Sequence, residues 1–332
     1  MSFKLICTGD LMLGENVHHF RRGIFSRYKG KYPSLIADVV KKQLSAADLM
    51  LVNFEASLAE DKELAKMDIN RAIYVAPLQS LSLLKSIETQ MIVNIANNHF
   101  GQHGLQSANS SIQMLESNGF LVTGKNHIPV EISKEGYLLK VYGVSLVNDK
   151  YYEGAYFKST YDSLITDLQL ANKSENEIWV LSIHWGDEYL TRENKKQQIL
   201  AHELAKAGFD YISGHHPHVI QPYSRIGETS VFYSHGNFIF DQNFSSLTQK
   251  GLISIINLPE GQTQLFICQQ KHFKLVDIKP ISTDELKRFT EKSFHRKLPF
   301  IMRIRMKLEL IFRFYELNFP ILRTFTGRLI NN

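Results

Sequence analysis

Short polar groups follow six of the strands predicted in this chain, and this placement limits what the chain can fold into. The groups occupy residues 9–14, 53–55, 96–99, 184–189, 214–218 and 233–238. Each comes directly after a short apolar run of the kind that forms a buried strand. Because the carboxyl ends of strands in an α/β sheet meet at one edge, where ligands bind, we expect the groups to form one shared site.

The order of the predicted elements indicates an α/β fold. Strands are predicted at 4–8, 49–53, 91–95, 137–146, 178–183, 211–213 and 230–234, and helices at 34–44, 78–87, 105–117, 162–171 and 192–207. This alternation favours sheets that are at least partly parallel. Residues 252–258 and 264–278 are instead predicted to be antiparallel strands joined by a turn at 259–261. We expect one domain over residues 1–283, followed by a basic helical C-terminal segment, 284–332.

The composition is that of an ordinary globular protein, with 44% hydrophobic and 21% charged residues among 332. Cys7 and Cys268 form neither a metal-binding pair nor a disulfide framework. We expect no signal peptide, and no apolar stretch reaches the length of about 18 residues that a transmembrane helix needs. The sequence therefore predicts a cytoplasmic protein, either free or peripheral at the membrane.

The net charge of +5 is concentrated near the C-terminus. Residues 295–332 carry eight Lys and Arg against two acidic residues, which leaves a net charge of −1 for residues 1–294. A nucleic-acid binder needs basic residues on its working surface, so no nucleic-acid partner is expected. Residues 299–317 interleave apolar side chains with Arg and Lys. Such a segment either docks on an anionic membrane surface or a partner complex, or packs on the domain with its basic side in water.

The residue types in the six groups are those that bind divalent metal ions. Imidazole nitrogen and carboxylate oxygen suit Zn, Mn or Fe, and a carboxylate able to bridge favours two ions about 3.5–4 Å apart. A single histidine at a strand end is more often structural, whereas His215, His216 and His218 in one short run favour metal binding. We therefore predict two divalent metal ions (Mn, Zn or Fe) at the shared site.

The six groups also form a series of long motifs. They are Gly-Asp-x-Met-Leu-Gly from Gly9, Asn-Phe-Glu from Asn53, Ala-Asn-Asn-His from Ala96, His-Trp-Gly-x-Glu-Tyr from His184, Gly-His-His-Pro-His-Val-Ile-Gln from Gly214 and Tyr-Ser-x-Gly-Asn-Phe from Tyr233. This series resembles the CapA family of capsule and poly-γ-glutamate synthesis proteins over roughly residues 4–242. The resemblance implies a four-layer α/β/β/α fold of the calcineurin-like metallophosphoesterase superfamily, a sandwich of two mixed sheets.

The resemblance also implies roles for individual residues. The implied metal ligands are Asp10, Glu55, Asn98, His184, His216 and His218, and the implied catalytic residue is His99. Residues expected to orient these ligands, or to add a further one, are Glu15, Asn53, Asn97, His215, Glu188 and Asn237. Trp185 and Tyr189 are expected either to form a wall of the pocket or to pack in the core.

Three positions depart from the implied pattern. Met12 occupies a position that is His in the superfamily, so one metal site is either short of a ligand, more weakly filled, or completed by Glu15 or His215. Gln102 stands where the CapA pattern has an Asp, and His235 stands where it has a Leu. These changes leave the implied ligands in place but alter their surroundings.

Together these features predict a metal-dependent hydrolase of capsule, exopolysaccharide or poly-γ-glutamate metabolism. Its substrate is expected to be a phosphoester or an amide-linked polymer, and the sequence does not choose between P–O and C–N cleavage. The metal ions would activate water, and His99 would protonate the leaving group or stabilise developing charge. The alternative is a non-catalytic accessory subunit of a polymer synthesis or export complex.

Overall fold

Two mixed β-sheets form the centre of the computed structural model, which describes residues 2–292 together with residues 304 and 308. The first sheet contains, in spatial order, β16 (Lys274–Ile281), β15 (Gln262–Lys271), β14 (Lys250–Leu258), β1 (Phe3–Leu11), β2 (Leu49–Phe54), β5 (Gln90–Asn94) and β6 (Leu121–Thr123), and β13 (Asn237–Ile239) pairs with β1. The second contains β11 (Tyr223–Ile226), β12 (Thr229–Phe232), β10 (Tyr211–His215), β9 (Glu177–His184), β8 (Tyr137–Ser145) and β7 (Val130–Lys134). A small third sheet pairs β3 (Ser57–Ala59) with β4 (Val75–Pro77).

The strands at the centre of each large sheet run parallel. β1, β2, β5 and β6 pair in parallel in the first sheet, and β8, β9, β10 and β12 do so in the second. Antiparallel strands lie at the edges, namely β14 to β16 in the first sheet and β7 and β11 in the second. This arrangement confirms the predicted α/β fold with partly parallel sheets.

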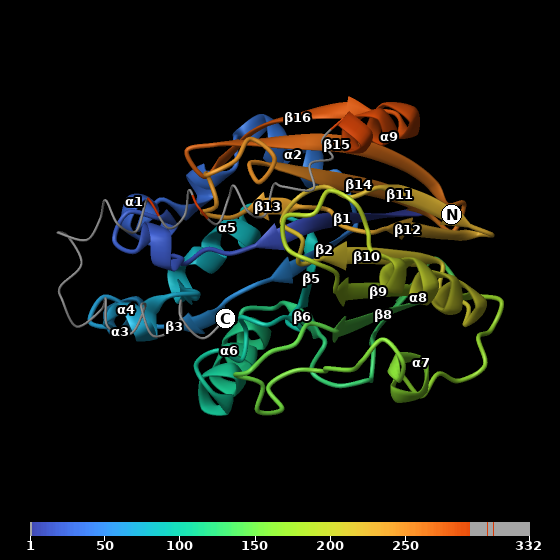
Figure 1. The fold of residues 1–332 in the computed structure, drawn as a ribbon, viewed down its shortest axis with the longest axis horizontal. Coiled ribbons are helices and arrows are strands. Elements are labelled where there is room, and N and C mark those ends of the chain that lie inside the picture. Colours follow the sequence, from blue (N-terminus) through green and yellow to red (C-terminus); the bar gives the residue numbers. More distant parts are fainter. Residues whose placement is uncertain (1, 293–303, 305–307, 309–332) are drawn as a thin grey trace.

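Helices cover the outer faces of both sheets (Figure 1). The helices of the described residues are η1 (Val17–His19), α1 (Ile24–Tyr28), η2 (Tyr32–Leu35), α2 (Asp38–Leu44), α3 (Asp61–Leu64), α4 (Ile69–Ala72), η3 (Leu78–Leu81), α5 (Ser82–Lys85), α6 (Leu105–Ser117), α7 (Leu164–Asp167), α8 (Lys195–Lys206) and α9 (Thr283–Lys292). The buried residues of α2, α5 and α6 join one apolar cluster with the first sheet. Those of α7 and α8 join another with the second sheet.

The inner faces of the two sheets pack directly against each other. Leu5 and Leu51 of the first sheet share a buried cluster with Val141 and Val180 of the second. Because successive side chains of a strand point to opposite faces, the residues between them are left to pack under the helices. The resulting order of helix, sheet, sheet and helix confirms the predicted four-layer α/β/β/α architecture.

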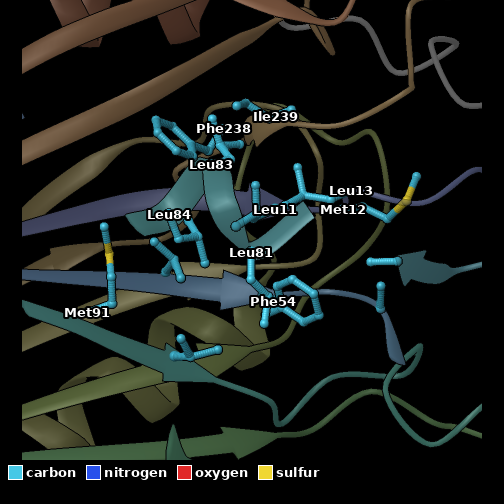
Figure 2. Packing of buried hydrophobic residues seen from close by; sticks show 14 of the residues in the cluster. Leu11, Met12, Leu13, Phe54, Leu81, Leu83, Leu84, Met91, Phe238 and Ile239 are labelled. Atoms are coloured by element: carbon cyan, nitrogen blue, oxygen red, sulfur yellow. The ribbon is translucent and has the colours of Figure 1, made fainter. Parts of the chain in front are cut away.

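The outer face of the first sheet is held by a dense apolar layer near the carboxyl ends of its strands. Figure 2 shows Leu81, Leu83 and Leu84 of the η3–α5 segment beside Phe54 of β2 and Phe238 of β13. All five side chains are almost fully buried. Burial of one such side chain stabilises the fold by about 1.5–3 kcal/mol. The strand ends that carry the polar groups are therefore firmly supported from behind.

Residues 264–278 do not form the single strand that was predicted. β15 ends at Lys271 and β16 begins at Lys274, and the two strands run antiparallel. His272 and Phe273 make the turn between them, with φ values of 53° and 67°. Tight hairpin turns usually place Gly, Asn or Asp at positions of positive φ. This turn lacks those residues, so no turn was predicted at this position.

Three of the predicted helices are shorter or broken in the structure. The segment 34–44 is interrupted because Ile36 and Ala37 are extended between η2 and α2. The segment 162–171 is helical only over α7. The segment 78–87 divides into η3 and α5. The helix predicted at 105–117 agrees with α6.

The C-terminal part of the described chain is the helix α9, which agrees with the helix predicted from residue 284. Leu286 of α9 is buried beside Ile220 and Phe232. The domain boundary at residue 283 stays a prediction. The basic segment 299–317 lies outside the described residues except for positions 304 and 308. Within the part of the chain that the structure describes, we find no helix with the length and apolar character to cross a membrane.

Candidate metal centre

Strand periodicity directs the polar residues of the strand ends into the space between the two sheets. In β2, Leu49 and Leu51 face the second sheet, and Asn53 continues the same side. In β9, Ile178 and Val180 face the first sheet. His184 comes an even number of residues after Val180 and therefore lies on the same side of the strand. The two sheets therefore stop packing through apolar residues and meet through polar ones at a single end of the sandwich.

Asp10, near the end of β1, lies at the centre of this polar region. Its Oδ1 accepts a hydrogen bond from Nδ2 of Asn53 at 2.8 Å and lies 3.2 Å from Nδ1 of His215. Its Oδ2 accepts from the backbone N–H of His216 at 3.2 Å and lies 3.2 Å from Nδ1 of His218. Burial alone would raise the pKa of Asp10, but the adjacent imidazoles of His215 and His218 hold the pKa well below its usual value. Asp10 is therefore an ionised carboxylate with no exposure to solvent.

Glu55, just after β2, has a buried oxygen atom that a bound cation would satisfy. Its Oε1 is buried and makes no hydrogen bond, yet it lies 3.7–3.8 Å from the Nε2 atoms of His99, His184 and His218. These separations are too long for hydrogen bonds but suit atoms that coordinate a common ion at about 2.0–2.2 Å. Ligand atoms of Asp10, Glu55 and His184 all lie within 4.8 Å of one another. The residues present thus fit a divalent metal ion.

His216 and Asn98 extend this set of ligand atoms. Nδ1 of His216 is buried without a hydrogen-bond partner, and its ring centroid lies 4.8 Å from that of His184. The Oδ1 of Asn98 lies 2.8 Å from Nε2 of His184. Burial lowers the pKa of His216 to about 3 and that of His184 well below 6.5. Both rings are therefore neutral near pH 7 and offer the lone pairs that metal binding requires.

The backbone at His216 and His218 is strained. Their φ values are 95° and 57°, in a region that residues with a side chain rarely adopt. Such strain concentrates at functional sites, where the surrounding structure maintains it. The strain here brings the backbone N–H of His216 onto Asp10 and leaves both rings inside the site.

A network of asparagine amides holds the oxygen ligands in place. Oδ1 of Asn53 accepts hydrogen bonds from Nδ2 of Asn94 and Nδ2 of Asn97, each at 3.3 Å. This orients Nδ2 of Asn53 toward Asp10 and, at 3.5 Å, toward Oε2 of Glu55. Oδ1 of Asn97 accepts from the backbone N–H groups of residues 99 and 100. Asn94 was missing from the sequence prediction, although it continues the inward-facing side of β5.

Asn237 orients the ring of His218 through a hydrogen bond. Its Nδ2 donates to the backbone oxygen of Thr248 and to Oε1 of Gln242, so its Oδ1 is directed at Nδ1 of His218, 3.0 Å away. Burial lowers the pKa of His218, but the carboxylates of Glu55 and Asp10 outweigh this effect and raise the pKa to about 10. With Nδ1–H engaged by Asn237, Nε2 is the atom of His218 that faces Glu55.

His99 is held between two residues that the sequence prediction did not assign to the site. Its Nδ1 lies 2.9 Å from Oε1 of Gln102, and its ring stacks on Tyr74 with the ring centroids 3.6 Å apart. Gln102 stands where the CapA pattern has an Asp, so an amide oxygen contacts His99 here in place of a carboxylate oxygen. Tyr74 has a φ of 57°, and no local motif marks it because it reaches the site from the β3–β4 region.

Met12 and Glu15 turn away from the ligand atoms. Met12 packs in the apolar cluster behind the first sheet (Figure 2), and its sulfur accepts the backbone N–H of Gly14. The carboxylate of Glu15 accepts hydrogen bonds from the backbone N–H groups of Arg21, Gly23 and Ser26. Of the two residues proposed to replace the missing histidine, only His215 lies against Asp10.

The remaining candidates divide between the site and the core. Glu188 is exposed, and its charge raises the pKa values of both Glu55 and His218, which locates it near the mouth of the site. The Tyr189 ring lies 5.9 Å from that of His218 and forms part of the wall. Trp185 is fully buried and donates its indole N–H to the backbone oxygen of Tyr233, so it belongs to the core.

Comparison with known proteins identifies the family. The model of the family "Bacterial capsule synthesis protein PGA_cap" matches residues 4–242, which include all six polar groups. This chain belongs to that family. The match confirms the resemblance inferred from the motifs.

Two curated relatives of the family are similar to this chain. The "PGA biosynthesis protein CapA" of Bacillus subtilis (strain 168) is 28% identical over 295 residues, which cover 85% of this chain and 75% of the relative. The "Capsule biosynthesis protein CapA" of Bacillus anthracis is 27% identical over 269 residues, which cover 75% of this chain and 63% of the relative. Among solved structures, the calcineurin-like phosphoesterase YfkN from Bacillus subtilis is 12% identical and covers 91% of this chain and 99% of its own, with a TM-score of 0.39.

Proposed function

We propose that this protein is a metal-dependent hydrolase of capsule or poly-γ-glutamate metabolism that cleaves a phosphoester or an amide-linked polymer at a centre of two divalent metal ions. The observation that carries the proposal is the buried Oε1 of Glu55, which lacks a hydrogen bond and faces three imidazole Nε2 atoms. The residues that would hold the ions are Asp10, Glu55, Asn98, His184, His216 and His218. When bound, the ions supply positive charge that activates water and polarises the bond to be cleaved.

His99 is the residue that would move a proton. Its Nδ1–H donates to Gln102, which leaves Nε2, 3.8 Å from Glu55, as the atom that faces the site. Burial lowers the pKa of His99 to about 4, so near pH 7 the ring is neutral, with its proton on Nδ1 and a lone pair on Nε2. Stacking on Tyr74 fixes the plane of the ring and with it the direction of that transfer. In the proposed role, Nε2 takes up a proton during the reaction and passes it to the leaving group.

A second candidate function is that of an accessory subunit in polymer synthesis. The printed names of both CapA relatives refer to biosynthesis, which supports a role beside a synthesis or export complex. In that case the metal centre would be structural. Docking of the basic C-terminal segment on a membrane surface or such a complex, with the domain at the cytoplasmic face, is part of the same proposal.

A turnover assay separates the two candidates. Protein loaded with Mn, Zn or Fe is assayed against nitrophenyl phosphoesters and against poly-γ-glutamate with γ-glutamyl anilides. We expect hydrolysis of one class, and a 10²–10⁴-fold lower kcat in His99→Gln with unchanged metal content. The matched control is His202→Gln, which changes an exposed histidine of α8 and should retain the activity. Absence of turnover with every metal, or equal rates in wild type and His99→Gln, would favour the accessory role.

A further inference from the structure

The loop that carries His99 contains a second histidine, His103, which contacts a segment from a distant part of the sequence. Nε2 of His103 lies 2.7 Å from the backbone oxygen of Ile73. A carbonyl oxygen only accepts hydrogen bonds, so Nε2 of His103 is the donor. Ile73 is buried and immediately precedes Tyr74, whose ring stacks on His99. His103 therefore binds the backbone beside the residue that covers the ring of the proposed proton donor.

The peptide group between Ile73 and Tyr74 is hydrogen-bonded at both of its polar atoms. Its N–H donates to the backbone oxygen of Glu15 at 2.9 Å, and its carbonyl oxygen accepts from His103. Tyr74 has a φ of 57°, a conformation that a residue with a side chain rarely adopts. Rotation of this peptide group would let φ return to an ordinary value. The two hydrogen bonds therefore maintain the strained conformation of Tyr74.

The direction of the Tyr74 ring depends on this backbone conformation, because the Cα–Cβ bond turns with the peptide group. On the other side of Tyr74, its backbone oxygen accepts from the N–H of Ser57 at 3.0 Å. The rings of Tyr74 and His99 are nearly parallel, with an angle of 8° between their planes and 3.6 Å between their centroids. Gln102 holds the edge of the His99 ring, whereas Tyr74 holds its face.

The loop that carries both histidines is anchored to the domain by contacts that do not involve His103. Phe100 is fully buried in the apolar cluster of the first sheet, which also contains Ala155. A Cβ atom at Gly101 would lie 3.1 Å from Cβ of Ala155, so the two segments are in close contact. Because the loop is fixed in this way, the hydrogen bond of His103 positions the Tyr74 segment on the loop.

We propose that His103 is a positioning residue that, through its hydrogen bond to the carbonyl of Ile73, holds Tyr74 against the face of the His99 ring. This inference rests on the proposed function in giving His99 a part in proton transfer. Without the hydrogen bond, Tyr74 relaxes and the His99 ring is free to tilt. Its Nε2, which lies 3.8 Å from Oε1 of Glu55, then loses its fixed direction, and catalysis depends on such alignment.

The stacking is measured directly by ¹H NMR of the His99 ring protons in metal-free protein, with the signals assigned from His99→Gln. Protons over the face of an aromatic ring are shielded, so we expect upfield signals in the wild type. In His103→Leu they should move downfield, toward their position in Tyr74→Leu, which lacks the aromatic ring. His103→Gln keeps a side-chain N–H that can reach the same carbonyl and should retain most of the upfield shift. His202→Leu, on the exposed surface of α8, is the control and should leave the signals unchanged.

Turnover by metal-loaded protein distinguishes positioning of His99 from a general effect on the fold. We expect kcat to fall roughly 10–100-fold in His103→Leu, with little change in KM, and to recover largely in His103→Gln. In the His99→Gln background the same His103→Leu substitution should cause no further loss, because residues that act as a unit are not additive. A merely structural role would lower kcat by the same factor in both backgrounds.

Two results would overturn the inference. One is a His103→Leu variant in which the His99 ring protons keep their wild-type signals, and the other is an equal loss of kcat in the two backgrounds. A wild-type protein without turnover would contradict the proposed function, but the NMR measurement would still decide whether His103 holds Tyr74 on His99.

Discussion

The two sheets contribute chemically different halves to the candidate metal centre. The first sheet and its loops supply oxygen, from the side chains of Asp10, Glu55 and Asn98. The second supplies nitrogen, from the rings of His184, His216 and His218. On the oxygen side a network of asparagine amides fixes the ligands, whereas on the nitrogen side strained backbone at His216 and His218 does so.

This difference indicates that metal ions would join the two sheets. Apolar packing holds the sheets together along most of the interface, but it ends before the site. At the site, carboxylates of one sheet face imidazoles of the other. Asp10 lies at the middle of this junction, because His215, His216 and His218 of the second sheet all approach it. The pKa of Asp10 is lowered, whereas burial raises the pKa of Glu55. Asp10 is therefore the carboxylate whose negative charge faces the imidazoles of the second sheet.

The largest expected effect is the loss of metal-linked stability in Asp10→Asn. At a free metal concentration 100-fold above the dissociation constant, binding stabilises the wild type by about 2.7 kcal/mol, which raises Tm by roughly 4–5 °C for a domain of this size. Asp10→Asn removes the central negative charge and should abolish this shift. The measurement is thermal unfolding with and without added Zn or Mn.

The matched control for that experiment is Asp241→Asn. Asp241 is equally buried, but burial raises its pKa well above 3.8, and its Oδ2 accepts the backbone N–H of Asn16 outside the ligand set. The substitution should retain the metal-dependent shift. If both variants lose the metal-dependent shift in Tm, or both keep it, then Asp10 is not the residue through which metal binding joins the two sheets.

A smaller effect is expected from the acid sensitivity of the nitrogen side. Burial lowers the pKa of His235 from 6.5 to about 3, so the unfolded chain binds a proton there that the folded chain does not. The stability contributed by neutral His235 is complete above pH 6.5 and is lost as the pH falls toward 3. Each such group steepens the decline by about 1.4 kcal/mol per pH unit. Metal-free His235→Leu should therefore lose stability less steeply than the wild type, by about that amount, in urea unfolding between pH 5 and 6.

Equal slopes for the two proteins would mean that His235 takes up its proton without unfolding. The slope, and not the absolute stability, is the informative quantity, because the substitution also changes packing beside Phe232.

The sequence predicted the layers and the location of the site because both follow from short-range patterns. Strand periodicity and the strand-end polar groups led to an α/β domain with partly parallel sheets and to one shared edge, whereas the sandwich of two sheets was implied by the resemblance to the CapA family. Where local signals were weak, the prediction was wrong, as at the hairpin turn of His272 and Phe273. The helix predicted at 34–44 was overestimated because tertiary contacts favour extended backbone at Ile36 and Ala37.

The parts of the site that could not be predicted depend on contacts between distant segments. Tyr74 stacks on His99 from a loop whose sequence carries no motif. From the sequence, Gln102 was only a position where the CapA pattern has an Asp. The structure shows that its amide oxygen contacts the ring of His99. Glu15 follows the first motif closely enough to suggest a ligand, yet loop N–H groups occupy its carboxylate. Sequence spacing specifies which residues reach the strand ends but not the directions of their side chains.

Elemental analysis of metal in protein purified without chelator is the most direct test of the central claim. We expect about two equivalents of a transition metal in the wild type, and loss of that metal in the Asp10→Ala/His216→Ala double variant, which removes one ligand from each half. Wild-type protein that contains no metal, and takes up none when Mn, Zn or Fe is added, would contradict the account.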